Sequence, residues 1–432
     1  MRADVLTSYN KQGVSTPHID QLARDGVLFT KAISPSPWTL PSLASIMTGL
    51  SPSVHMVTGL KSKLSDTLPS LAEYMRDAGY STAAIVHNDL LRPRSNLSKG
   101  FLEYHFLQNP SFGDSFGAGL LQVVLPRQFP SPPWPSTSDH TRLANNWLKT
   151  NYEKDFFLWI HYYDPHAPYA PPVEYLPKVE PLPSIGTRFT RQRDVMSGIF
   201  VPSLDEREWI KDLYDGEVRY VDENIGKLLD TLKRLNLYDE SLIIFTSDHG
   251  EEFWEHGRYG HGHSLYAELL WVPLIIKLPL SALKEPINEV VTTQSIMPTI
   301  LDLCGIDYES NHLSVDSLSL LWKLNPHAFE GQPIIITGQI LFDNTESVIF
   351  NGLKYIRSLM TNLEELYVLS RDPGEQNSIV SSSPDKVQRA RNILKKHNEK
   401  AKKLREHYLI TKKDEIEFNR EKMQRLKELG YI

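Results

Sequence analysis

Thr39 stands in a segment where a hydroxyl could serve as a nucleophile. The preceding residues, Ala32–Trp38, are rich in Ser and Pro and predict a loop. Pro41 suits the first turn of a short helix, and Gly49 is a natural terminator. Backbone N–H groups and the helix dipole at such a junction favour an anion, such as a sulfate or phosphate group. The alternative is that Thr39 or Ser42 only caps the helix.

A candidate metal site follows a predicted strand in the second half of the chain. Leu242–Thr246 is an apolar run typical of a buried strand, and the string Ser247-Asp248-His249-Gly250-Glu251 comes directly after it. In open α/β sheets, ligands bind just beyond the carboxyl ends of the strands. Adjacent Asp and His side chains there offer an oxygen and a nitrogen to a divalent cation. The alternative is a turn with a capping aspartate.

Two further segments place histidines in loops. Glycines separate His256, His261 and His263, which predicts a polar loop rather than a core element. A second apolar strand, Phe156–Ile160, ends in the polar, turn-forming segment His161–Tyr169. Its first residue, His161, is a lesser candidate, because a lone histidine on a strand is more often a satisfied core residue.

These segments together resemble the sulfatase family of the alkaline-phosphatase-like superfamily. Pro37–Gly49 is similar to the sulfatase signature, in which a nucleophile precedes x-Pro-Ser, a short apolar helix and a closing Thr-Gly. Ser247–Glu251 resembles the metal-binding motif, and Asp164–Tyr169 resembles the Asp-Pro-His-x-Pro-Tyr loop. The resemblance covers nearly the whole chain. It implies an α/β fold whose mostly parallel sheet is sandwiched by helices.

The resemblance also implies roles for the matching side chains. Thr39 becomes the nucleophile and an oxygen ligand of the metal, beside Asp248 and His249. His166 faces the substrate, and Asp164 orients its imidazole, as neighbouring groups commonly do for a functional histidine.

His261 falls where sulfatases often place a lysine that contacts the sulfate and the leaving group. A protonated histidine can do similar work as an electrostatic clamp or a general acid. His263 is a further candidate for substrate contact, and so is His256, although either can be an ordinary loop histidine.

The nucleophile position departs from the family pattern. Its usual cysteine or serine is oxidised to formylglycine, whereas Thr39 carries a methyl on Cβ, so the same oxidation cannot give the aldehyde. Leu43 stands where other sulfatases have an arginine that helps to position formylglycine. We therefore expect a plain hydroxyl nucleophile and no formylglycine. Threonine nucleophiles occur in related phosphodiesterases and phosphoglycerol transferases.

The first residues are the second departure. Met1–Leu6 aligns with a family segment that follows a buried strand ending in Asp-Thr, whose aspartate is a metal ligand. We therefore expect sequence upstream of Met1 to supply that strand and that carboxylate. Residues 1–432 alone are expected to be poorly soluble or inactive. Asp4 could substitute, although the family uses its position structurally.

The predicted cofactor is one divalent cation, and a carboxylate-plus-imidazole set admits calcium, manganese, magnesium or zinc. The predicted reaction is attack of Thr39 on the sulfur or phosphorus of a small-molecule, glycan or lipid ester. Two alternatives stay open. One is a phosphodiesterase or a transferase of the phosphoglycerol or phosphoethanolamine type, and the other is an inactive fold kept for binding.

Composition agrees with an α/β enzyme of more than one structural unit. The 432 residues suffice for a large core, and the net charge of -7 gives no basic footprint for nucleic acid. Cys304 is the only cysteine, so no disulfide pattern indicates a compartment. No run is apolar and long enough to span a membrane. With a truncated start, the lack of a signal peptide leaves cytoplasmic and exported locations open.

Residues 1–324 alternate strand and helix patterns, which predicts a catalytic α/β domain. Pro-rich stretches at 108–138 and 171–203 interrupt it. Residues 325–432 predict an α+β subdomain, with short antiparallel strands and then exposed amphipathic helices over 386–429.

Overall fold

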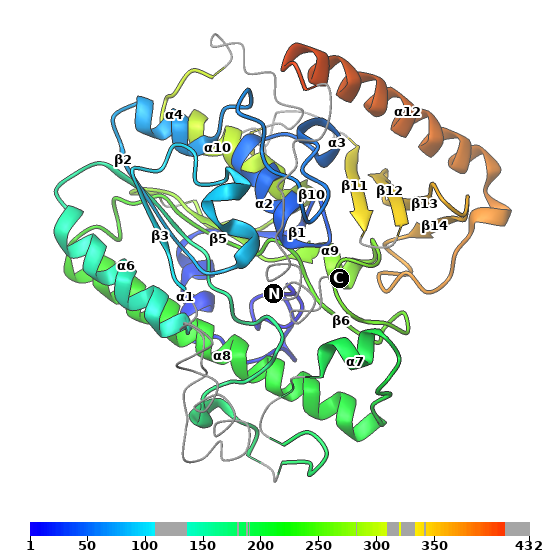
Figure 1. The fold of residues 1–432 in the computed structure, drawn as a ribbon, viewed down its shortest axis with the longest axis horizontal. Coiled ribbons are helices and arrows are strands. Elements are labelled where there is room, and N and C mark those ends of the chain that lie inside the picture. The colour runs from blue at the N-terminus through cyan, green and yellow to red at the C-terminus, as the bar shows by residue number, and fades with distance from the viewer. Residues whose placement is uncertain are drawn as a thin grey trace.

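Two sheets form the centre of the computed structural model, which describes residues 1–108, 136–178, 181–186, 189, 191–281, 283–308, 319–320, 333–340 and 343–410 (Figure 1). The first sheet has the order β10 (Ile287–Thr292), β1 (Val27–Ile33), β9 (Leu274–Lys277), β5 (Ile243–Thr246), and β8 (Trp271–Val272) also pairs with β1. The second has the order β3 (Glu103–Phe106), β2 (Ser81–Val86), β4 (Phe156–Ile160).

Most of these strands share one direction. Strand β10 is parallel to β1, while β9 is antiparallel to both β1 and β5, so β1, β5 and β10 run the same way. Strands β3, β2 and β4 are all parallel. The carboxyl ends of β4 and β5 therefore lead into the loops His161–Tyr169 and Ser247–Glu251, which the sequence predicts as parts of the site.

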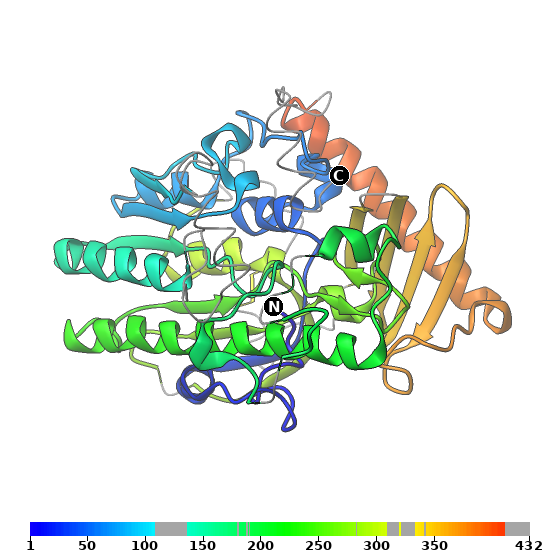
Figure 2. The same cartoon turned by 60° about the horizontal axis from the view of Figure 1, so that its bottom comes forward.

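Helices cover both faces of the strands (Figure 2). On one face lie α2 (Thr39–Thr48), α4 (Leu71–Asp77) and α10 (Ile296–Leu303), which contact one another. On the other lie α1 (Pro17–Asp25), α6 (Thr137–Asn151) and α8 (Leu204–Arg234). The fold class predicted from the sequence, a mostly parallel sheet sandwiched by helices, is confirmed.

Helix α8 shows how the sequence builds this layer. The Ser203 hydroxyl accepts from the Glu206 N–H, and the Glu206 carboxylate accepts from the Ser203 N–H, a reciprocal cap that satisfies two otherwise unpaired donors. Val218, Val221 and Ile225 are buried along one face of the helix. That apolar face holds the helix against the strands, beneath the loops that follow β4 and β5.

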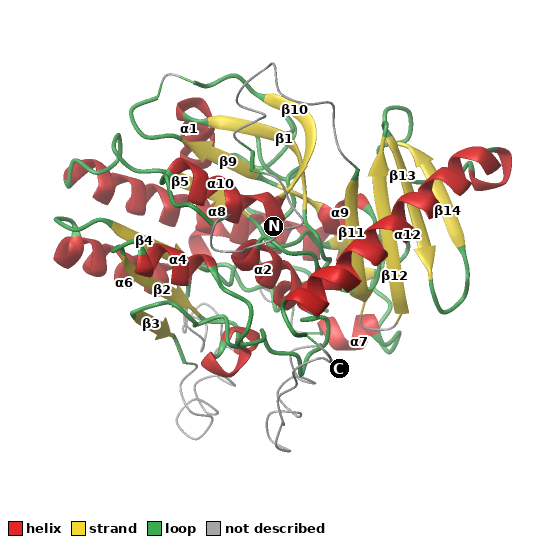
Figure 3. Ribbon diagram, turned by 90° about the horizontal axis from the view of Figure 1, so that it is seen from above, coloured by secondary structure: helices red, strands yellow, loops and turns green. Residues whose placement is uncertain are grey.

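The C-terminal part is a separate antiparallel sheet with one long helix (Figure 3). Its strand order is β11 (Ile334–Ile340), β12 (Asp343–Phe350), β13 (Leu353–Ser358), β14 (Glu364–Val368), and α12 (Pro384–His407) lies across it. Ala401 and Leu404, near the end of α12, pack into the core of the main body and contribute to the same cluster as α2 and α10.

The predicted antiparallel sheet with a following helix is thus confirmed, and the boundary at residue 324 stays a prediction. Residues 109–135 of the first Pro-rich stretch, parts of the second, and residues 411–429 of the expected terminal helices lie outside the described residues. Short helices at α3 (Pro52–His55), α7 (Gln192–Met196) and α9 (Ala267–Leu270) link the larger elements. Among the described residues, none of the helices combines the length and the hydropathy that a membrane span requires.

Candidate active site

Thr39 is the first residue of α2 and only 1% of its surface is exposed. Trp38 before it is extended, and Gly49 ends the helix in the left-handed region at φ 65°, with its N–H donating to the Ser45 carbonyl. The hydroxyl therefore lies at a helix N-terminus, as the sequence predicts. No side chain caps this helix, so the reading of Thr39 or Ser42 as a cap is wrong.

Ser42 instead ties the two main motifs together. Its hydroxyl donates to the Asp248 carbonyl at 2.6 Å, and the Ser34 hydroxyl donates to the same oxygen. These bonds hold the loop after β5 against the first turn of α2. As a result, Thr39 Oγ1 lies 3.3 Å from His249 Nε2. Residues more than two hundred positions apart in the chain thus form one site.

The His249 ring presents a lone pair to this site. Its Nδ1 lies 2.7 Å from the Gly250 carbonyl, which can only accept, so Nδ1 carries the proton. Nε2 is then the acceptor, and it faces both Thr39 Oγ1 and, at 3.5 Å, Asp248 Oδ2. Two acceptors turned toward each other with a hydroxyl beside them suit a cation, so these donor atoms fit a divalent metal.

The protonation states agree with that assignment. Burial raises the pKa of Asp248, but the His249 and His161 imidazoles and the amine of Met1 outweigh it and hold the pKa well below its usual range. Burial lowers the pKa of His249 to about 4. A charged carboxylate and a neutral imidazole are the forms that bind a metal. Within the described ranges, however, no three His, Cys, Asp or Glu side chains surround one point.

The Met1 amine lies at the edge of this site. It donates to Ser247 Oγ at 2.7 Å and to the His249 carbonyl at 2.9 Å. Asp4 does not substitute for a metal ligand, because both of its carboxylate oxygens accept from the Arg2 guanidinium. The third ligand expected from the resemblance therefore has no counterpart at Asp4.

His261 joins the site from the strand pair β6 (Glu252–Phe253) and β7 (Tyr259–Gly260). Its ring centroid lies 4.2 Å from that of His249 and 5.1 Å from that of His166. Glu251 Oε1 lies 2.8 Å from His261 Nδ1, and both side chains are buried. Burial raises the pKa of Glu251, but the histidines around it outweigh this and lower the pKa to about 2, so the carboxylate is ionised.

His166 completes the group of imidazoles. Its Nδ1 lies 2.5 Å from the Ala167 carbonyl, and burial with the nearby His261 lowers its pKa to about 3, so the ring is neutral near pH 7. The expected orienting partner, Asp164, is engaged elsewhere: its Oδ2 accepts from the Thr137 hydroxyl at 2.7 Å and from the Thr137 N–H. Its role toward His166 stays a prediction.

The family model described as Sulfatase matches residues 1–306. The chain belongs to the sulfatase family. A protein named Sulfatase from Formosa agariphila is 27% identical over 85% of this chain and 78% of its own length. An Arylsulfatase from Clostridium perfringens is 25% identical over 92% of both chains. The solved phosphonate monoester hydrolase of Silicibacter pomeroyi shares the fold, with a TM-score of 0.72 and 21% identity over 95% of this chain and 94% of that one.

Sequence reasoning missed one contributor to this sulfatase site and underrated another. Nothing in the sequence assigns a role to Glu251, which closes the Ser-Asp-His-Gly-Glu string and pairs with His261. His161 is only a lesser candidate in the sequence, yet its imidazole contributes to the low pKa of the Asp248 carboxylate. Position in the sequence could have indicated both residues. His161 directly follows the last residue of β4, and Glu251 lies two residues after the expected ligand His249.

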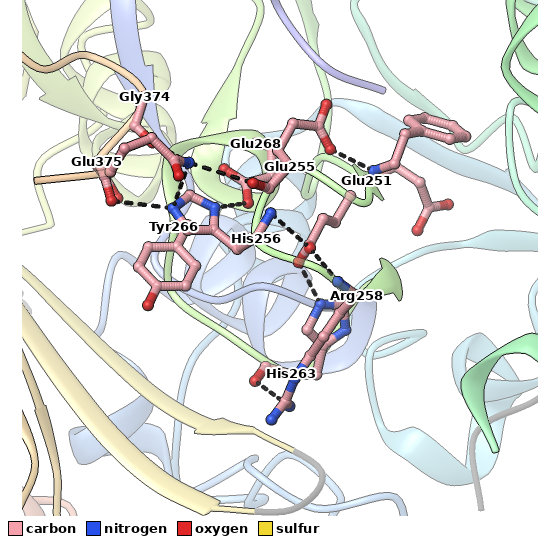
Figure 4. Close-up of polar contacts among 12 residues, drawn as sticks. Glu251, Glu255, His256, Arg258, His263, Tyr266, Glu268, Gly374 and Glu375 are labelled. Atoms are coloured by element: carbon pink, nitrogen blue, oxygen red, sulfur yellow. Dashed lines mark hydrogen bonds and ion pairs between the residues drawn. The ribbon is translucent and has the colours of Figure 1, made fainter. Parts of the chain in front are cut away.

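His263 and His256 lie in a neighbouring polar network (Figure 4). His263 Nε2 is 2.7 Å from Glu252 Oε2, and both side chains are almost fully buried. His256 stacks on Tyr266 with ring centroids 3.6 Å apart, while its Nδ1 lies 2.6 Å from Glu268. The substrate contact proposed for His263 therefore stays a prediction, and the contacts of His256 are structural.

His256 should make the stability of the sulfatase depend on pH. Burial lowers its pKa, but hydrogen bonds to Glu268 and the Glu375 carbonyl outweigh this and raise it from 6.5 to about 9. Because the folded pKa is the higher one, the stabilisation is complete below pH 6.5 and is lost as pH rises through 9. His256→Gln should cost about 1–3 kcal/mol at pH 6 and much less at pH 10, measured by urea unfolding.

The matched control is His105→Gln, which alters a half-exposed histidine beside Glu103. It should change the free energy of unfolding by less than about 0.5 kcal/mol at either pH. A loss in His256→Gln that is equal at pH 6 and pH 10 would rule out the charged form of His256 as its cause.

Proposed function

We propose that this protein is a metal-dependent hydrolase that cleaves a sulfate or phosphate ester with Thr39 as nucleophile. The observation that carries the proposal is the buried approach of Thr39 Oγ1 to His249 Nε2 at 3.3 Å, with the Asp248 carboxylate beside it. The family match, the sulfatase relatives and the phosphonate monoester hydrolase neighbour support hydrolysis of this class of ester.

His249 serves better as a ligand than as a base for Thr39. With a pKa of about 4, its imidazole is a poor proton acceptor near neutral pH, where general bases have pKa values close to 7. Asp248, His249 and Thr39 would hold a divalent cation, which would lower the pKa of the Thr39 hydroxyl and offset the charge of the incoming ester. Because the Thr39 hydroxyl itself is the nucleophile in this proposal, no formylglycine is expected.

The histidines then act on the substrate. Nδ1 of His261 lies 2.8 Å from the Glu251 carboxylate, which orients the ring so that it can act as a general acid toward the leaving oxygen. The ring of His166 is neutral, and its centroid lies 5.1 Å from that of His261. At that distance His166 can help to position the group being transferred. In-line attack by the Thr39 oxygen forms a bond to sulfur or phosphorus as the bond to the leaving alcohol breaks. Water then cleaves the covalent intermediate, which restores the Thr39 hydroxyl and releases the free sulfate or phosphate anion.

His261→Gln should therefore discriminate between leaving groups. A general acid matters for a poor alkoxide leaving group and little for 4-nitrophenolate, so we expect a loss of about 10²–10⁴-fold in kcat for an alkyl ester and less than about tenfold for the nitrophenyl ester. Glu251→Gln should shift the rates in the same direction by a smaller factor, because Glu251 is a positioning residue. The measurement is kcat and KM for both esters.

Equal losses on both esters in His261→Gln would show that His261 does not protonate the leaving group. His105→Gln, at a surface site, is the control and should leave both rates unchanged.

The substrate class is tested with a panel of aryl sulfate, phosphate monoester, phosphate diester and phosphonate monoester. Hydrolysis of any of these supports the proposal, and activity on none in metal-loaded protein would favour an inactive fold kept for binding. Threonine at the position of the nucleophile favours one second candidate, a phosphoryl transferase or phosphodiesterase, in line with the resemblance. Adding glycerol distinguishes transfer from hydrolysis: a transferase makes the glyceryl ester, whereas a hydrolase releases only the products of hydrolysis.

A further inference from the structure

A groove of about 590 Å³ lies along α12, where that helix crosses the C-terminal sheet (Figure 3). Its lining comes from Arg357 of β13 and from positions 388, 391, 392, 395, 398, 399 and 402 of α12. Residues three and four apart share one face of a helix, so these positions form a single stripe about 21 Å long. We call this feature the α12 groove. It shares no residue with the Thr39 site.

The α12 groove is lined by four cations, and Glu399 is the only acid among its lining residues described here. Three of the cations, Arg391, Lys395 and Lys402, are exposed and follow one another along the helix over about 17 Å. The chain as a whole carries a net charge of -7, so this row of positive charge stands out on an acidic protein. A row of cations suits an extended polyanion better than a single small ion.

Carboxylates beside the groove hold its two arginines in place without using all of their donors. Glu364 accepts from Nε of Arg391 at 2.7 Å and from Nη2 at 2.5 Å. Glu346, which is only 4% exposed, accepts from Nη2 of Arg357. A guanidinium has five N–H donors, and Nε of Arg357 is buried without a partner in the described part of the chain. Both arginines are therefore oriented and still have donors for the oxygens of a ligand.

Side-chain amides lie between these cations. Gln388 Nε2 donates to Asn392 Oδ1 at 3.1 Å, and Asn398 Nδ2 donates to a Glu346 oxygen at 3.2 Å. An amide both donates and accepts hydrogen bonds, as the hydroxyl groups of a sugar do. A chain of sugars that carries anionic groups therefore matches both the amides and the cations of the groove.

A membrane surface and a nucleic acid fit the α12 groove less well. A helix that lies on a membrane inserts an apolar face, whereas the apolar side chains Val387, Leu394 and Leu404 of α12 are already packed inside the protein. Proteins that bind single-stranded nucleic acid stack its bases on aromatic rings. Among the described residues that line the groove, none is aromatic.

We propose that the α12 groove binds an acidic polysaccharide, that is, a chain of sugars bearing sulfate or carboxylate groups. The anionic groups pair with Arg391, Lys395 and Lys402, and the sugar hydroxyls bond to Gln388 and Asn392. The proposal adds a second binding site to the protein. It goes beyond the proposed ester hydrolysis and does not depend on it.

The test measures by fluorescence anisotropy how tightly the 432-residue protein binds labelled dextran sulfate and labelled polygalacturonate, with dextran as the uncharged control. The double variant Lys395→Gln/Lys402→Gln removes two charges from the groove and should weaken binding by about tenfold. The matched control, Lys396→Gln/Lys403→Gln, removes two exposed lysines of the same helix that do not line the groove. It should weaken binding by less than about twofold.

A gain of affinity provides a second test, which a damaged fold cannot imitate. Because Glu399 places a negative charge in the groove, Glu399→Gln should strengthen the binding of an acidic polysaccharide by about two- to fivefold. Glu406→Gln is its control, since it removes an exposed carboxylate of the same helix that does not line the groove. It should change the affinity by less than about twofold.

Equal losses in the two lysine pairs, or no gain in Glu399→Gln, would overturn the proposal, and so would dextran binding as tightly as both acidic polymers. Binding of only one acidic polymer would support it and identify the anionic group as sulfate or as carboxylate. Tighter binding of a thymidine oligonucleotide or of phosphatidylserine vesicles, with the same dependence on Lys395 and Lys402, would replace the polysaccharide by a nucleic acid or a membrane. Because no readout uses turnover, failure here leaves the proposed hydrolysis untouched, and an inactive enzyme leaves the binding result standing.

Discussion

Thr39→Ala should abolish turnover and leave the protein folded. If the hydroxyl is the nucleophile, no neighbouring group replaces it, since the other buried hydroxyl of the same turn, Ser42, is bonded to the Asp248 carbonyl. Removing a nucleophile typically costs about 10³-fold or more in kcat. The structural cost is small, about 1 kcal/mol, because the hydroxyl makes one long hydrogen bond, to His249 at 3.3 Å. The measurement is kcat beside a thermal unfolding curve.

Two further variants test whether the hydroxyl of Thr39 is responsible for this loss. Thr39→Ser keeps an oxygen at the same place and should retain activity within about tenfold, which tests for a hydroxyl rather than for threonine itself. Thr48→Ala removes a buried hydroxyl at the other end of α2, where Thr48 donates to the Ala44 carbonyl, and should leave kcat unchanged. If Thr39→Ala works within a few-fold of the wild type, the nucleophile lies elsewhere.

The parts of the site that follow from local sequence could be predicted. A Ser/Pro-rich loop followed by Pro41 and Gly49 fixes where α2 begins and ends, so Thr39 had to lie at its first turn. Asp248 and His249 are adjacent and follow an apolar strand, so they had to lie together at the carboxyl end of β5. Neither prediction depends on which distant segments of the chain come into contact.

The pairing of acids with imidazoles could not be predicted, because the chain offers several partners of equal chemistry. Glu251 directly precedes β6 and Glu252 is its first residue, and their carboxylates contact different histidines, His261 and His263. Likewise, the contact of the Asp164 carboxylate with Thr137, at the start of α6, joins residues 27 positions apart and follows from the fold. Packing between helices, strands and loops decides which of these side chains meet, and the hydrophobic periodicity of the sequence does not determine that packing.

Strand edges show the same limit at a larger scale. The sequence predicts an apolar strand at β4 and a buried strand at β5, and helices cover both faces of the sheets that contain them. Their partial exposure arises at the cavity between the two strands, which residues 156–166 and 240–251 line. The sequence pattern indicates which face of a strand is apolar but not which backbone edge is paired, so this cavity could not be predicted from the sequence.

Asp248→Asn should remove metal from the protein. The substitution preserves shape and deletes the charge, and the neighbouring imidazoles that hold the pKa of Asp248 low then lose the carboxylate that offsets them. We expect the divalent metal measured by elemental analysis to fall well below one equivalent, with a loss of about 10²-fold or more in kcat. Asp302→Asn, at an exposed site on α10, is the matched control and should keep its metal.

His249→Ala separates a metal ligand from a general base. As a ligand, His249 contributes binding energy for the cation, so the variant should regain part of its activity at millimolar divalent metal, and a chelator should suppress the wild type. As a base, it would leave metal content unchanged, and added metal would restore nothing. The geometry favours the first outcome, because Nδ1 is fixed on the Gly250 carbonyl and Nε2 faces a carboxylate 3.5 Å away that cannot donate to it. Wild-type protein that is active and free of metal by elemental analysis would refute the assignment of both residues.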